Sequence, residues 1–236
     1  VTDPQRVVSI AMGRRVDGNE RLQRILSYPI YRDMTAAASA FDQVAAYSPD
    51  AMAFGRGRDA HELRGMRVSA NYFATLGVRP AVGRFFLPEE IGNPTAPRVL
   101  VLGYGFWQRQ FEGNQSAIGS TLAIGDDQYT IIGVAPQGFT GVTNEAVDAW
   151  VPLTANVTPE EYASWLRSRQ AYWLRIIARV PDGLTPERAS SIATAALRAG
   201  AVRDGESPQE IATSSPSVHL VSVLPRKARA DSTEAK

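Results

Sequence analysis

The residue types that could carry acid–base or metal chemistry are few in this chain, and they lie far apart. The two histidines, His61 and His219, are expected in a polar turn and in a strand, without partners at metal-ligand spacing. The Glu-Glu pair at 89–90 suits the first turn of a helix, and the Asp-Asp pair at 126–127 suits a hairpin turn. Cysteine is absent, which excludes disulfides, thiolate ligands and cysteine nucleophiles. We therefore expect no catalytic residue and no metal site.

Glycines that could cradle a phosphate stand at Gly103-Tyr104-Gly105, after an apolar run and before a predicted helix. A dinucleotide-binding loop needs a third glycine where this sequence has Gln108, and Gln108-Arg109 is bulky where the helix should approach the pyrophosphate. Neither a P-loop nor a Gly-x-Ser-x-Gly nucleophile elbow occurs in the sequence. We expect no nucleotide and no other cofactor.

The residues left for a binding role are apolar and lie in the middle of the chain. Most of the aromatic side chains there are expected in the core. The turn-rich loop with Phe139, Thr140 and Val142 is the predicted contact surface for a partner, because a loop of this composition is expected at the surface.

Composition limits the class of protein. The chain has 236 residues, 44% of them hydrophobic, and a net charge of +1, so it can form a sizeable core and shows no basic field for nucleic acid. Its longest apolar stretch, at 99–102, is far shorter than the ~20 residues that span a bilayer. No signal-peptide pattern follows Val1, and a start at valine suggests a piece of a longer protein whose membrane helices would lie outside it.

The outer parts of the sequence predict the elements that would position these residues. Near the N-terminus, strands are predicted at 7–12, 43–47 and 63–70, a polar loop at 14–20 and a helix at 28–39 that begins at Ser27. Near the C-terminus, a helix begins at the capping box of Thr158 and Glu161, a strand follows at 173–179, a helix runs from 185 to a stop at Gly200, and a strand lies at 218–223. The tail from 226 to 236 is expected to be mobile. Two β-α-β units of this kind form the split layer of an α+β fold.

The middle of the sequence has closely spaced turn signals and short strands. It predicts a helical turn at 87–90, a strand at 99–102, a helix at 104–111, a hairpin at 121–124 and 128–134, and a strand at 148–153. We therefore expect a discontinuous outer subdomain formed by 1–80 and 154–236, with a strand-rich subdomain, 81–153, inserted into it.

The most distinctive run, 68–86, combines several conformational signals. Asn71 is predicted to cap a short helix, Gly77 to close it in the left-handed conformation, and Pro80 and Gly83 to fold the connection that follows. This run is expected to be a stiff joint between the two subdomains.

Several motifs, in their order and spacing, resemble a known family. They are found at 27–29 and 31–33; at 68–73, 76–80 and 83–84; at 102–109, 111 and 118–119; and at 131–136, 138–139 and 148–153. Together they are similar to the MacB-like periplasmic core domain of FtsX-like ABC transporter permeases, and within it to the acidobacterial duplicated orphan permease group. The resemblance extends from about Val7 to Val223.

The resemblance implies an extracytoplasmic, periplasmic domain between the first two membrane helices of an export permease in the bacterial inner membrane. It implies that the outer subdomain is porter-like and that the insertion is Sabre-like. Members of the family dimerise, and a cytoplasmic ATPase supplies energy that moves the periplasmic part, which expels substrate or acts on a periplasmic adaptor or other partner. No catalytic residue, metal or cofactor belongs to the pattern, so the chain is expected not to be an enzyme.

Two other functions stay open on the residues alone. A periplasmic binding module would hold a small apolar ligand or peptide in the aromatic middle section. A hydrolase would depend on Asp126, Asp127 or His61.

Overall fold

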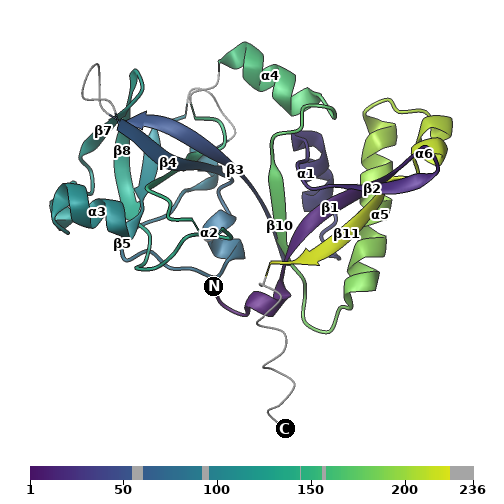
Figure 1. Cartoon of the computed structure of the whole chain (residues 1–236), viewed down its shortest axis with the longest axis horizontal. Helices are drawn as coiled ribbons and strands as arrows, with labels where there is room; N and C mark the ends of the chain where they lie inside the picture. The colour runs from purple at the N-terminus through teal and green to yellow at the C-terminus, as the bar shows by residue number, and fades with distance from the viewer. Residues whose placement is uncertain (55–60, 92–95, 144, 156–157, 224–236) are drawn as a thin grey trace, which may run out of the picture. The chain divides into compact units, whose positions relative to one another are not determined.

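The computed structural model describes residues 1–54, 61–91, 96–143, 145–155 and 158–223. The chain folds as two units (Figure 1): a terminal unit, Val1–Val44 with Trp165–Lys236, and a central unit, Ala45–Ser164. The terminal unit is discontinuous, and the central unit is inserted into it. The observed limits of the central unit, 45 and 164, lie outside the expected limits of the insertion, 81 and 153. The expected turn at 55–59 and the C-terminal tail lie outside the described residues.

The terminal unit packs helices on an antiparallel sheet around β1. Its elements are η1 (Pro4–Arg6), β1 (Val7–Val16), β2 (Asn19–Gln23), α1 (Tyr28–Ala36), β10 (Arg175–Arg179), α5 (Pro186–Arg203), α6 (Pro208–Ser214) and β11 (Ser217–Ser222). Strand β1 pairs antiparallel with β10, β11 and β2. Ile30 and Met34 of α1 and Leu197 of α5 pack on Ile10 and Met12 of β1 and form the centre of the core.

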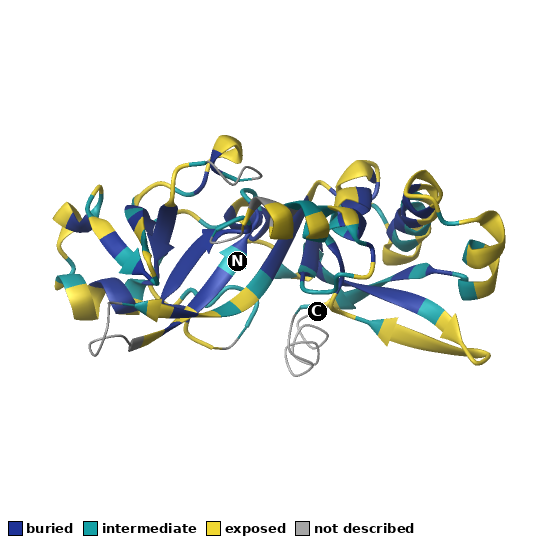
Figure 2. Ribbon diagram, turned by 90° about the horizontal axis from the view of Figure 1, so that it is seen from above, coloured by how far each residue is buried: buried dark blue, intermediate teal, exposed yellow. Residues whose placement is uncertain are grey.

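The predicted polar loop at 14–20 is wrong, because β1 continues to Val16 and turns back as β2. Asp17 and Gly18 both have positive φ, 51° and 77°, which suits the two-residue turn that matches strand twist. Figure 2 shows the ends of both strands exposed, beyond the buried part of β1. The end of this hairpin is polar because its pairing is specified by the Asp17-Gly18 turn and not by a buried apolar face.

The central unit is a mixed sheet in which six of the strands pair in a closed ring. Its elements are β3 (Gln43–Phe54), which starts at the unit boundary, β4 (His61–Val68), α2 (Tyr72–Thr75), β5 (Val82–Gly83), η3 (Pro88–Glu90), β6 (Val99–Leu102), α3 (Tyr104–Phe111), η4 (Gln115–Ala117), β7 (Thr121–Ile124), β8 (Asp127–Val134), β9 (Ala149–Pro152) and α4 (Pro159–Arg167), which ends beyond the boundary. The strand order is β3-β4-β9-β6-β8-β5, and β7 pairs with both β8 and β3. The resulting ring, β3-β4-β9-β6-β8-β7, surrounds a core that includes Leu100, Leu122, Tyr129 and Ile131.

Three predicted elements of the central unit are confirmed: the strand at 99–102 is β6, the helix at 104–111 is α3, and the hairpin is β7–β8. The run 68–86 lies wholly inside this unit. Gly77 has the expected positive φ of 64°, but Asn71 is not a side-chain cap. Its Oδ1 accepts a hydrogen bond from the Ser69 hydroxyl at 2.8 Å instead.

The run 68–86 places Phe73 in the centre of an aromatic cluster. The Phe73 ring is buried and stacks on the Phe85 ring, with centroids 3.8 Å apart and planes 5° apart. Trp150 of β9 and Phe139 contact the same ring at 5.6 and 5.8 Å between centroids. The aromatic residues that link α2, β9 and the 139–142 loop thus form a packed part of the core.

Candidate functional site

His219 is a candidate for acid–base chemistry whose side chain acquires a partner from a distant part of the sequence. Its Nε2 atom lies 2.9 Å from Glu20 Oε1 and 3.0 Å from Ser217 Oγ, and the Ser217 hydroxyl also donates to Glu20 Oε1 at 3.0 Å. A catalytic triad needs the acid and the nucleophile on opposite nitrogens of the imidazole, whereas here both contact one nitrogen. Hydrogen bonds from Ser217 and His219 lower the pKa of the Glu20 carboxyl. The cluster therefore holds the strands together, and its geometry is not that of a triad.

The glycine motif at Gly103 has a packing explanation. A Cβ at this position would overlap the carbonyl oxygen of Val147. The Gly103 N–H donates to the Asp148 carbonyl at 2.8 Å, so the backbone of the next segment occupies the space that a phosphate would need. Gly103 is required for this close approach and does not form a phosphate cradle.

The acidic pairs lie in the expected turns. Asp127 is the first residue of β8 and pairs with Arg98 at 3.1 Å. Glu90 ends η3 and accepts hydrogen bonds from Arg84 at 2.7 and 2.9 Å and from the Leu87 N–H at 2.9 Å. Burial opposes ionisation of Glu90, but the contacts from Arg84 and Leu87 outweigh it and lower its pKa. These carboxylates stabilise turns.

The predicted contact loop is half-buried. Phe139 packs in the aromatic cluster, and the hydroxyls of Thr140 and Thr143 each donate to the carbonyl oxygen of the other, at 2.6 and 3.2 Å. Val142 is half-buried as well. A partner contact at Phe139, Thr140 and Val142 stays a prediction.

Within the described ranges, no three His, Asp or Glu side chains come together where they could bind a metal ion. Among the helices in those ranges, none combines the length and the apolar character needed to cross a bilayer.

Asp148 is a carboxylate of the central unit that joins two other elements through arginines. Its carboxylate accepts hydrogen bonds from Arg64 of β4, at 3.1 and 3.2 Å, and from Arg109 of α3 at 2.9 Å. Burial alone would raise the pKa of Asp148, but these hydrogen bonds outweigh it and lower the pKa. Asp148 thus joins two elements to the start of β9.

This lowered pKa predicts a defined acid sensitivity. A carboxyl whose pKa is lower in the folded chain contributes stability above its unfolded pKa and loses it as the pH falls through the folded value. Between about pH 5 and pH 2, wild-type chain should lose about 1 kcal/mol more stability than Asp148→Asn, a small figure because both arginines are largely exposed. Urea unfolding at each pH measures this difference, and parallel pH curves for the two proteins would contradict it.

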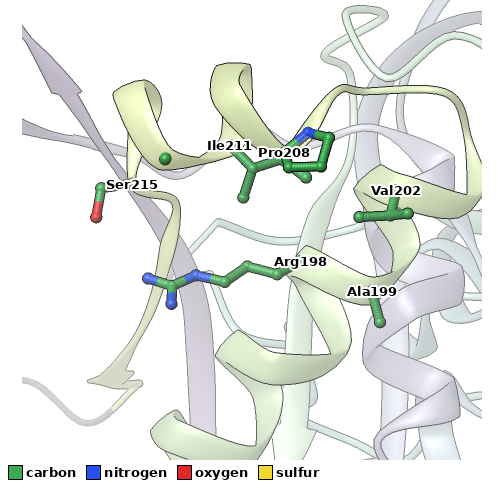
Figure 3. A pocket seen from close by; sticks show the side chains of 7 residues that line it. Arg198, Ala199, Val202, Pro208, Ile211 and Ser215 are labelled. Carbon is green, nitrogen blue, oxygen red and sulfur yellow. The ribbon is translucent and has the colours of Figure 1, made fainter.

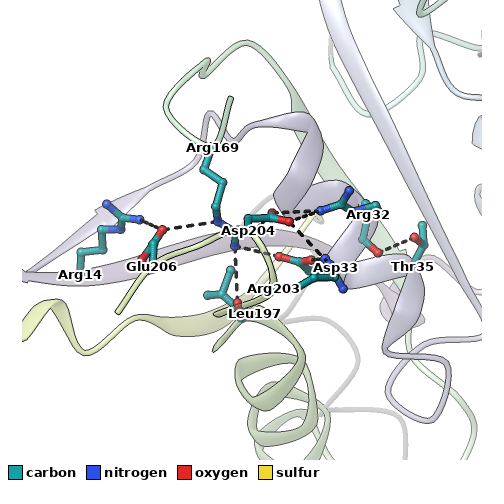
Figure 4. A network of polar contacts seen from close by, with 9 residues as sticks. All are labelled: Arg14, Arg32, Asp33, Thr35, Arg169, Leu197, Arg203, Asp204 and Glu206. Carbon is teal, nitrogen blue, oxygen red and sulfur yellow. Dashed lines mark hydrogen bonds and ion pairs between the residues drawn. The ribbon is translucent and has the colours of Figure 1, made fainter. Parts of the chain in front are cut away.

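In the terminal unit, a buried ion-pair network is built around Arg169 (Figure 4). The guanidinium donates to Asp33 of α1 at 2.8 Å and to Asp204, directly after α5, at 2.7 Å. The side chain of Arg169 is 6% exposed and that of Asp33 is 0% exposed. Both remaining contacts of Arg169, to the Leu197 carbonyl at 3.4 Å and to Glu206 at 3.5 Å, lie on α5 or just after it.

Further arginines complete the network at its exposed rim. Arg203 donates to Asp33 at 2.6 Å, and Arg32 donates to Asp204 at 2.7 and 2.9 Å. Burial raises the pKa of Asp33 against the opposing effect of Arg169 and Arg203, whereas the arginine contacts lower the pKa of Asp204 despite its burial. Because Asp204 and Glu206 lie between α5 and α6, the network positions the connection that carries α6.

Gly200 is part of this arrangement, so the predicted helix stop is wrong. Helix α5 continues to Arg203, and a Cβ on Gly200 would overlap the carboxylate of Asp33. The glycine is needed for the close approach of α1 and α5, not to end the helix.

Gly200→Ala is expected to destabilise the chain. Helix propensity alone would favour alanine by about 1 kcal/mol. The carboxylate of Asp33 is held by two arginines and has no room to move, so we expect a net loss of about 1–3 kcal/mol. Urea unfolding followed by circular dichroism measures this loss. Ala195→Gly at an exposed position of the same helix reports propensity alone, and a Gly200→Ala variant more stable than wild type would refute the packing argument.

An open apolar cavity of about 350 Å³ lies between α5 and α6 (Figure 3). Its apolar walls come from Ala199, Val202, Pro208, Ile211 and Ala212. Arg198 extends from α5 across the cavity toward Ser215, the residue at the end of α6.

Sequence reasoning missed both the network and α6. The signal for α6 is local: Ser207 accepts from the Glu210 N–H and Glu210 accepts from the Ser207 N–H, a capping box ahead of Ile211. The network has no local signal, because Arg169 and Asp33 are 136 positions apart.

Comparison with known structures supports one fold assignment. A domain of a permease protein from Porphyromonas gingivalis is 14% identical, with a TM-score of 0.64 over 92% of this chain and 90% of that chain. The periplasmic region of MacB from Actinobacillus actinomycetemcomitans is 14% identical, with a TM-score of 0.59 over 99% and 94%. The extracellular domain of the noncanonic ABC-type transporter YknZ from Gram-positive bacteria is 12% identical, with a TM-score of 0.57 over 91% and 99%.

Among curated proteins, no sequence matches significantly. The sequence profile described as the MacB-like periplasmic core domain, in contrast, matches residues 1–196. The match includes all of the central unit and most of the terminal unit, and it ends within α5. The chain therefore belongs to the family of MacB-like periplasmic core domains of ABC-type permeases.

Proposed function

We propose that this chain is the extracytoplasmic part of an ABC-type export permease and transmits motion, driven by a cytoplasmic ATPase, to substrate expulsion or to a partner protein. The observation that carries the proposal is the family match over residues 1–196, joined by the likeness in fold to the periplasmic region of MacB. The partners are then the membrane helices of the permease, its ATPase, a second copy in the full protein, and an adaptor or substrate outside the inner membrane.

The path of the backbone supports a mechanical role. The chain passes between the two units inside strand β3 and inside helix α4, rather than in loops. Segments held by ladder or helix hydrogen bonds transmit displacement more directly than flexible linkers do. A porter-like role for the terminal unit and a Sabre-like role for the central unit are part of the proposal.

The side chains of the candidate site support a role without catalysis. Glu20 and Ser217 contact the same nitrogen of His219, and the buried charges of Asp33 and Arg169 are paired with each other. An activated nucleophile needs a base that is itself oriented by a third group, and His219 does not have that arrangement.

The test is a distance measurement in the full permease, reconstituted with its ATPase in lipid vesicles. The 236 residues contain no cysteine, so spin labels can be placed at Gln110→Cys in the central unit and Ala195→Cys in the terminal unit, both exposed. We expect the distance distribution to change between the ATP-bound and ADP-bound states.

A label pair inside one unit is the matched control. Gln110→Cys with Leu87→Cys, both exposed and both in the central unit, should keep one distance in the two nucleotide states. Unchanged distances for the first pair during active ATP hydrolysis would count against transmission of motion through this domain.

A further inference from the structure

Two cavities adjoin at the α6 end of the terminal unit. The apolar cavity between α5 and α6 is lined by Arg198 and Ser215 on one side, and the same two residues line a second cavity of about 300 Å³. The second cavity continues to Arg15, Gly18 and Glu20 of the β1–β2 hairpin and is mainly polar. An apolar compartment and a polar compartment are therefore joined through one arginine and one serine.

The apolar compartment is open and its walls are only lightly packed. Helix α6 has no buried residue, and Val202 of α5 is 54% exposed. The side chains of Pro208 and Ile211 point from α6 toward α5 (Figure 3). At about 350 Å³ the compartment lies in the size range of small-ligand sites, and its lining accepts an alkyl chain.

The polar compartment carries an excess of positive charge. Arg15 and Arg198 both line it. Arg15 lies opposite Glu20 in the β1–β2 ladder and attracts its carboxylate, so of the two arginines Arg198 is the one that no carboxylate among the described residues neutralises. Its one acid, Glu20, already accepts hydrogen bonds from Ser217 and His219. Arg198 uses its Nε to donate to the Pro216 carbonyl at 3.0 Å, an interaction that leaves both of its terminal nitrogens for another acceptor.

The backbone at the junction is held in an uncommon conformation. Ser215 has φ 40° and ψ 57°, in the left-handed region that residues other than glycine seldom adopt. Its N–H donates to the Ile211 carbonyl at 2.8 Å, which ends α6 and directs the chain between the two compartments. The α5 and α6 residues of the site follow residue 196, the last residue of the family match, whereas Arg15, Gly18 and Glu20 lie within it.

The geometry points to a binding site for a free amphiphile with one alkyl chain and one carboxylate head. The chain lies between α5 and α6 against Val202 and Ile211, and the carboxylate lies between the guanidinium groups of Arg198 and Arg15. An arginine guanidinium presents paired N–H donors that match a carboxylate. The site does not depend on the proposed transmission of motion.

Isothermal titration of the 236-residue chain with dodecanoate, below its micelle concentration, tests the proposal. We expect one site, and we expect decanoate to bind about fifteenfold more weakly, because it is two methylenes shorter and each buried methylene contributes about fourfold. Dodecyl maltoside, which has the same tail and a neutral head, should bind at least about tenfold more weakly, because it lacks the charge-assisted contacts.

Two variants separate the halves of the site. Arg15→Gln with Arg198→Gln should remove the preference for dodecanoate over dodecyl maltoside, and Val202→Asp should abolish binding of both. Arg188→Gln, exposed on the same helix and ~15 Å along it, is the matched control and should bind as wild type does. Circular dichroism checks the fold of each variant, and Val202→Asp remains informative if the double variant does not fold, since Val202 is exposed.

Several outcomes would overturn the proposal. Absence of dodecanoate binding is the first. Equal affinity for the neutral and anionic heads would show general apolar adsorption. Binding to vesicles of anionic phospholipid without binding of free dodecanoate would identify a membrane-surface contact instead.

Discussion

Replacing Arg169 by methionine is expected to lower the free energy of unfolding by about 3–5 kcal/mol. The change leaves the fully buried carboxylate of Asp33 with Arg203 alone and removes one of the arginines from Asp204. Breaking a buried pair is more costly than never forming it, because one charge stays without its partner away from water. Urea unfolding of the 236-residue chain, followed by circular dichroism, gives this free energy.

A double-mutant cycle shows whether the loss comes from the buried pair. Asp33→Asn in the Arg169→Met background should cost less than it does in wild type, with a coupling of about 1–3 kcal/mol. Arg32→Met removes a neighbouring arginine whose side chain is 47% exposed, and it should cost only about 1 kcal/mol or less. Equal losses for Arg32→Met and Arg169→Met would contradict the view that the network is organised around Arg169.

Replacing Phe73 by alanine is expected to destabilise the central unit by about 3–5 kcal/mol. The ring is buried and contacts Phe85, Trp150 and Phe139, so its removal leaves a cavity that the surrounding strands cannot fill. Because Trp150 is itself in this cluster, its fluorescence should report the loss at lower urea concentration than in wild type.

The control for Phe73→Ala is Leu87→Ala. The Leu87 side chain is 41% exposed, so its truncation should change the free energy of unfolding by less than about 0.5 kcal/mol. Phe73→Leu keeps most of the buried volume, so its loss of stability should lie between those of Phe73→Ala and Leu87→Ala. If Phe73→Ala unfolded at the same urea concentration as wild type, the run 68–86 would be peripheral to the core.

The network and the aromatic cluster both bear on the proposed transmission of motion. Each unit is held at its centre by contacts between residues far apart in sequence: ion pairs around Arg169 in the terminal unit and stacked rings around Phe73 in the central unit. Well-packed interiors have low compressibility and transmit strain. Variants that loosen either centre are therefore expected to weaken transmission in the full permease as well as stability.

The sequence by itself determined those elements whose start, turn or end is specified by residues close together in the chain. Helix α3 begins directly after a buried run of four residues, the β7–β8 hairpin turns at Gly125, and α5 begins where Thr185 caps the Arg188 N–H. In each case the partners lie within a few residues of one another, so capping, turn and periodicity rules are sufficient. The family resemblance depends on the same short motifs, and the profile match confirms it.

Only the tertiary structure decided the partners of Gly200, Asp33 and His219. Gly200 has the sequence context of a helix stop, but the carboxylate of Asp33 occupies the space where its Cβ would be. His219 meets Glu20 across 199 positions, and Arg203 meets Asp33 across 170. A single sequence carries no record of which distant charges meet, because pairing depends on the register of β1 with its neighbours and on how closely α1 approaches α5. Strands β3 and β4 are expected in the outer subdomain, but most of β3 and all of β4 belong to the central unit. The reason is that β4 pairs with β9, some 80 positions further along the chain, and such a pairing leaves no local signal.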